Sequence, residues 1–155
     1  MQRNKYIAAR LQEVLIDGYW IANTNYKSQI QNLSYDHAYY KIGTLHSIAE
    51  LIFHINYYLE GLLRAFETGS LDISDKFSFD LSPETSAASW QNLIGQFHSN
   101  SRKFVQYIEQ MDDQLLDLDF IDSKYGTYLR NIEGVIEHAY YHLGQISLIH
   151  KLLNV

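Results

Sequence analysis

Apolar residues recur at alternating steps of three and four along much of this chain, which is the spacing of one face of an α-helix. The clearest case is the segment Thr44–Thr68, whose apolar positions are Ile48, Ile52, Ile55, Leu59, Leu62 and Phe66. Similar stripes predict helices over about Asn4–Asn23 and Tyr128–Leu153. Another helix is predicted to begin with Ser82 as N-cap and Pro83 as its first residue, and to end near Met111.

Three long connections join the predicted helices, at about Thr24–Gly43, Gly69–Leu81 and Asp112–Thr127. Because helices in simple bundles are joined by roughly two to eight residues, these lengths suggest crossovers that let neighbouring helices run parallel. No segment alternates as a strand does, although Tyr125–Tyr128 is suited to a short extended piece beside Gly126. We therefore expect residues 1–155 to form one all-α domain with long crossover connections.

Composition and charge exclude several classes of function. The chain of 155 residues has a formal net charge of −6 and no clustered lysine and arginine, which argues against a nucleic-acid partner. We expect a cytoplasmic protein with no membrane partner, because neither a transmembrane run nor the apolar region of a signal peptide is found. Since cysteine is absent, any metal must use nitrogen or oxygen ligands, and any thiol must come from a bound small molecule.

Histidines supply the candidate chemistry. In the stretch EHAYYHLGQI, His138 and His142 stand four residues apart, which places them on one face of the predicted last helix. At ~100° per residue they lie about 80–120° to one side of the apolar stripe, and His54 lies on the same side of its own stripe. Three imidazoles that face one another would form an open metal site, whereas imidazoles bonded to tyrosines or carbonyl groups would be packing residues. Spacing alone leaves both interpretations open.

Several neighbours of these histidines have candidate roles. Glu50 precedes the first of them by one turn and is a candidate fourth ligand, outer hydrogen-bond acceptor or general base, with a solvated surface charge as the alternative. Gln145 is expected to hydrogen-bond a ligand or a neighbouring helix, and Gly144 to let another helix approach closely. His46 and His150 are expected in packing or at a dimer surface.

The segments SIAELIFHI (Ser47–Ile55) and HAYYHLGQI (His138–Ile146) together resemble the signature of the DinB superfamily, and the resemblance extends over nearly the whole chain. It implies a four-helix bundle with long crossovers, usually a homodimer, that holds a divalent metal on three histidines. Carried onto this sequence, the implied ligands are His54, His138 and His142. Zinc or nickel is the implied metal, with iron or manganese as further candidates.

Other metal signatures fit less well. A zincin site needs a glutamate directly after the first histidine, and none follows His138. A di-iron bundle needs Glu-x-x-His pairs, and no histidine here has a glutamate three residues before it. The resemblance implies a metal-dependent enzyme, either an S-transferase that uses a low-molecular-weight thiol or a hydrolase. Its small-molecule substrate, which the sequence does not identify, would lie in a tyrosine-lined cleft. The alternative is a non-catalytic dimeric module for metal binding or stress response.

Overall fold

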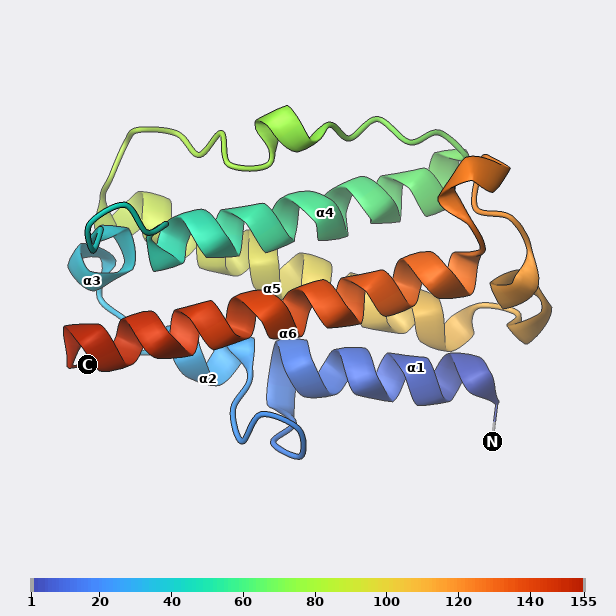
Figure 1. Ribbon diagram of the computed structural model, residues 1–155, viewed down its shortest axis with the longest axis horizontal. Helices are drawn as coiled ribbons and strands as arrows, with labels where there is room; N and C mark the ends of the chain where they lie inside the picture. The colour runs from blue at the N-terminus through green and yellow to red at the C-terminus, as the bar shows by residue number, and fades with distance from the viewer. Residues whose placement is uncertain (1, 155) are drawn as a thin grey trace.

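The computed structural model describes residues 2–154, and these residues form an all-α fold, as the sequence predicts. Helices α1 (Arg3–Gln12), α4 (Ile48–Thr68), α5 (Ala87–Gln110) and α6 (Tyr128–Leu153) lie lengthwise beside one another (Figure 1). The shorter helices α2 (Tyr26–Ile30) and α3 (Tyr35–Tyr39) lie toward the end of the molecule where α6 finishes. None of the helices within this described part is long and apolar enough to cross a membrane.

The directions of the helices confirm the expected crossover. Helices α4 and α5 run the same way, whereas α1 and α6 run the opposite way (Figure 1). Residues 69–86 join the end of α4 to the start of α5, and they return along the length of α4 to do so (Figure 1). This connection contains the short 3-10 helix η2 (Asp75–Phe77), and it lies close to the site described below.

Helix α4 begins at Ile48 rather than at the predicted Thr44, because a capping box fixes its first turn. The Ser47 hydroxyl accepts from the Glu50 backbone N–H, and the Glu50 carboxylate accepts in return from the Ser47 backbone N–H. The helix ends at Thr68, and the capping residue Gly69 has a φ of 71°, a left-handed conformation that glycine adopts at little cost. Apolar spacing between these two ends buries one face of α4 against α5 and α6.

The predicted first helix is too long. Helix α1 ends at Gln12, a π-helical turn η1 (Glu13–Asp17) follows, and Gly18 then takes an extended conformation. A side chain at Gly18 would clash with Glu13, so the glycine allows the chain to leave the helix at this point. The apolar pattern continues to Ile21, but that side chain is 66% exposed and does not face the core.

The predicted start of the third helix is also wrong. Helix α5 begins at Ala87, four residues after Pro83, because Ser86 and Ser89 form a reciprocal capping box there. The Asp112–Thr127 connection contains two 3-10 helices, η3 (Asp113–Asp117) and η4 (Ser123–Tyr125). The predicted extended piece is reduced to one isolated bridge between Asp119 and Thr127.

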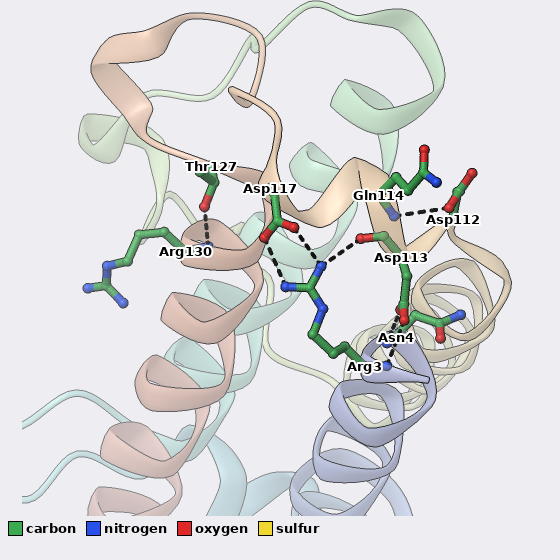
Figure 2. A network of polar contacts seen from close by, with 8 residues as sticks. All are labelled: Arg3, Asn4, Asp112, Asp113, Gln114, Asp117, Thr127 and Arg130. Atoms are coloured by element: carbon green, nitrogen blue, oxygen red, sulfur yellow. Dashed lines mark hydrogen bonds and ion pairs between the residues drawn. The ribbon is translucent and has the colours of Figure 1, made fainter. Parts of the chain in front are cut away.

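A polar network fixes the start of α1 against the end of α5 and η3 (Figure 2). The Asp113 carboxylate accepts from the backbone N–H groups of Arg3 and Asn4, which have no partner within their own helix. The Arg3 guanidinium donates two bonds to the Asp117 carboxylate, at 2.9 and 2.7 Å. The buried Asn4 side chain donates to the carbonyl groups of Glu109 and Met111, so each helix end helps to cap the other.

Candidate metal centre

Three imidazoles meet between α4 and α6. His54 comes from the first half of α4, and His138 and His142 come from successive turns of α6. Nε2 of His138 lies 3.0 Å from Nε2 of His54 and 2.9 Å from Nε2 of His142. The shoulders of the two helices therefore face each other, and these residues are called the three-histidine cluster below.

Acceptors outside the cluster orient two of the imidazoles. Nδ1 of His54 lies 3.2 Å from the carbonyl oxygen of Ser78, and Nδ1 of His142 lies 2.6 Å from Oε1 of Gln145. Because both partners are acceptors, each Nδ1 carries the proton and donates it outward. The Nε2 atom of each ring is then left with a lone pair that faces the centre of the cluster.

The donor set fits a divalent metal. With Nδ1 of His54 and His142 protonated, each of their Nε2 atoms presents a lone pair to Nε2 of His138. A neutral His138 imidazole carries a single proton, so it cannot donate a full hydrogen bond to both of these lone pairs. A cation in the centre of the cluster would instead bind all three Nε2 atoms. Two nitrogens bound about 2.1 Å from one metal lie about 3.0–3.4 Å apart. The two pairs that include His138, at 2.9 and 3.0 Å, are close to this range, and the ligand nitrogens of all three residues lie within 4.8 Å of one another.

The electrostatics of the cluster favour neutral imidazoles, which is the form that binds metals. Burial lowers the pKa of His54 to about 4, with a smaller contribution from His142. Burial and the two neighbouring imidazoles lower the pKa of His138 to about 4. Burial also lowers the pKa of His142, against the opposing effect of its bond to Gln145. Near neutral pH all three side chains are therefore uncharged.

Aromatic side chains enclose the cluster. Phe79 stacks on His54 with ring centroids 4.0 Å apart, and its ring also stacks on His46 at 4.0 Å. Tyr58 places its ring edge-on to His54 and His138, at 5.1 and 5.3 Å. Its hydroxyl donates to Asp75 at 2.7 Å, and burial is the main cause that raises the pKa of Tyr58 to about 12.

Ser78, Phe79 and Asp75 all come from the α4–α5 connection, and the apolar and motif patterns of the sequence do not predict their contacts with the cluster. No local pattern marks them, because each meets the cluster through a contact between segments distant in the chain. Gln145 was expected to hydrogen-bond a ligand or a neighbouring helix; its side chain instead contacts His142 on its own helix.

Other candidates lie outside the cluster. The Glu50 carboxylate accepts from the backbone of Ser47 and pairs with Lys41 at 2.7 Å, so it acts as a capping group of α4. His46 packs on Phe79, as expected for a packing residue. The expectation for Gly144 is wrong: the residue is exposed, and a Cβ placed there would meet nothing within 4 Å.

A model of the DinB superfamily matches residues 24–146 of this chain. The matched span contains the whole three-histidine cluster, together with Ser78 and Gln145. No match was found among curated proteins or among solved structures. Because the match covers most of the 155 residues, the chain belongs to the DinB superfamily.

Proposed function

We propose that this chain is a metal-dependent enzyme, of the thiol-dependent S-transferase or hydrolase type, that holds one divalent metal on His54, His138 and His142. The observation that carries the proposal is the geometry of the cluster. Nε2 of His138 lies 3.0 and 2.9 Å from Nε2 of His54 and His142, and the ligand nitrogens of all three residues lie within 4.8 Å of one another, while the Nδ1 atoms of two rings are held by acceptors outside the cluster. Packing alone gives no reason for the inward orientation of all three nitrogens.

Zinc and nickel are the metals proposed first, because borderline imidazole nitrogens suit both, and iron and manganese follow. A divalent metal on three neutral imidazoles supplies a Lewis acid with an open position for water, a thiol or a carbonyl oxygen. Ser78 and Gln145 keep the imidazoles oriented, and Phe79 and Tyr58 limit the access of water. Within residues 2–154 no carboxylate joins the cluster, which favours a nucleophile that is itself bound at the centre.

The proposal includes a four-helix bundle that acts as a homodimer on a small-molecule substrate. Leu45, Leu148 and Leu152 support the dimer, because these large apolar side chains are 45–55% exposed near the start of α4 and along the second half of α6. Light scattering after gel filtration measures the mass directly. A mass equal to that of a single chain would remove this part of the proposal.

Metal content is the first test. Untagged protein is loaded separately with zinc and nickel, passed through gel filtration, and analysed for bound metal. We expect about one ion per chain in the parent and little in the His142→Ala variant. His98→Ala is the matched control, because His98 is a half-buried helical histidine outside the cluster. Absence of metal from the parent, or equal metal in parent and His142→Ala, would overturn the proposal.

Turnover is the second test. The loaded protein is screened for transfer of small thiols to electrophiles and for hydrolysis of esters and amides, with His142→Ala as the background. Activity that follows the metal content supports the enzyme. Stoichiometric metal without turnover in either screen would instead favour the non-catalytic metal-binding module.

A further inference from the structure

A hollow of about 360 Å³ adjoins the cluster at His138. It lies between α4 and α6, and both the 69–86 connection and the 112–127 connection contribute to its wall. Its volume is within the range of about 300–1,000 Å³ that is usual for sites of small molecules. Most of the lining is apolar, and the large apolar side chains are Leu62, Leu71, Ile73, Phe120 and Val135.

Few polar groups face this hollow, and none of the lining residues is a lysine, arginine, aspartate or glutamate. The Tyr58 hydroxyl already donates to Asp75. Both amide hydrogens of Asn131 are used by the carbonyl groups of Tyr125 and Thr127, at 2.9 and 2.8 Å. The Asn131 carbonyl oxygen is left as an acceptor. The chemistry of the wall is therefore apolar and uncharged.

We propose that this hollow binds an uncharged, largely apolar tail of the small molecule whose head group occupies the open position of the metal. The inference rests on the proposed function, and it adds the class of substrate. A methylene group moved from water into an apolar wall improves binding by about fourfold. An anionic tail in the same place would lose its hydration without gaining a cationic partner, so it is rejected.

Gly134 offers a way to close the hollow without touching the cluster. It lines the hollow from α6, and a Cβ built there would meet nothing within 4 Å. A longer side chain at this position can therefore enter the empty space without a clash. Gly144 lies on the same helix with equally open surroundings, but it is exposed and does not line this hollow. Gly134→Met and Gly144→Met are thus a matched pair.

The test uses protein loaded with cobalt(II), whose thiolate complexes have a charge-transfer absorption band. Ethanethiol, butane-1-thiol and 3-mercaptopropionate are titrated separately, and each thiol releases its proton to the buffer when it binds. Two added methylenes predict that butane-1-thiol binds about 15-fold more tightly than ethanethiol. The anionic 3-mercaptopropionate, which is nearly the same size as butane-1-thiol, is expected to bind at least about tenfold more weakly than it.

Gly134→Met is expected to lose both preferences while it keeps its cobalt, and Gly144→Met is expected to keep them. Equal affinities for the three thiols, no thiolate band, or preferences that survive in Gly134→Met would overturn the assignment of the hollow. Failure of the parent to bind cobalt would overturn the proposed function itself. The two failures are therefore distinguishable, because the first occurs in protein whose metal content is normal.

Discussion

Replacement of Gln145 by leucine tests how the three-histidine cluster is held. Oε1 of Gln145 lies 2.6 Å from Nδ1 of His142, and this contact fixes the proton on Nδ1 and leaves Nε2 free. Leucine removes the acceptor but keeps a side chain of similar size at a half-buried position of α6. His142 is then free to rotate and to protonate Nε2, which is the atom that faces the other two imidazoles.

The magnitude follows from the geometry of the two outer contacts. Loss of an outer hydrogen bond to a metal-binding histidine lowers metal affinity by about 10–100-fold, or about 1.4–2.7 kcal/mol. The 2.6 Å contact of Gln145 is shorter than the 3.2 Å contact between Ser78 and His54. We therefore expect Gln145→Leu to fall in the upper half of that range, at about 30–100-fold.

The assay is competition for zinc with a coloured chelator at neutral pH, with helicity measured by circular dichroism in the same samples. Gln145→Glu is the control, because its carboxylate remains an acceptor for Nδ1 and should keep or increase the affinity. If Gln145→Leu bound zinc as tightly as the parent, the orientation of His142 would not depend on this contact. The account of why its Nε2 faces the cluster would then be wrong.

Four further predictions concern pH and stability. Burial lowers the pKa of His54 and His138 from 6.5 to about 4. The zinc that the protein retains on dialysis should therefore stay constant from neutral pH to about pH 5.5 and decrease below about pH 5. A loss of zinc centred near pH 6.5 would contradict this. Without metal, stability in urea should fall as the pH drops from about 6.5 to about 4, because the unfolded chain takes up protons first. Asn4→Ala should lower the free energy of unfolding by about 1–3 kcal/mol through two lost hydrogen bonds, whereas exposed Lys5→Ala should change it by less than about 0.5 kcal/mol. Gly61→Ala should be about 1–3 kcal/mol less stable than Gly134→Ala, because a methyl group at position 61 would clash with Ile73, whereas one at position 134 would meet nothing within 4 Å. Equal unfolding midpoints of the two variants would refute this.

The long core helices could be predicted because their apolar spacing is regular over many turns. Leu59 and Leu62 on α4, and Ile132 and Ala139 on α6, are all buried as their periods indicate. The meeting of the three imidazoles followed from the same spacing only as one of two alternatives. Periodicity gives the direction of a side chain around its own helix, but it does not say which helix faces it.

The ends of helices were harder to predict, because several local signals compete there. Ser82 followed by Pro83 is a good helix start in isolation, yet Ser86 is the residue that caps α5. Ser47 and Glu50 have the spacing of a capping box, and that signal explains the carboxylate better than a role in catalysis. The spacing of Ser47 and Glu50 is therefore enough to predict that Glu50 caps the N-terminus of its helix.

The two outer contacts of the cluster differ in how the sequence encodes them. Gln145 follows His142 by three residues, so the helix alone brings the two together. Ser78 follows His54 by 24 residues, and its carbonyl oxygen reaches the ring only because the 69–86 connection runs back along α4. A backbone carbonyl is present whatever the side chain, so this contact depends on the path of the connection rather than on the identity of Ser78. Changes that shift the connection should therefore disturb the three-histidine cluster, and weaken the proposed metal binding, even when all three histidines are intact.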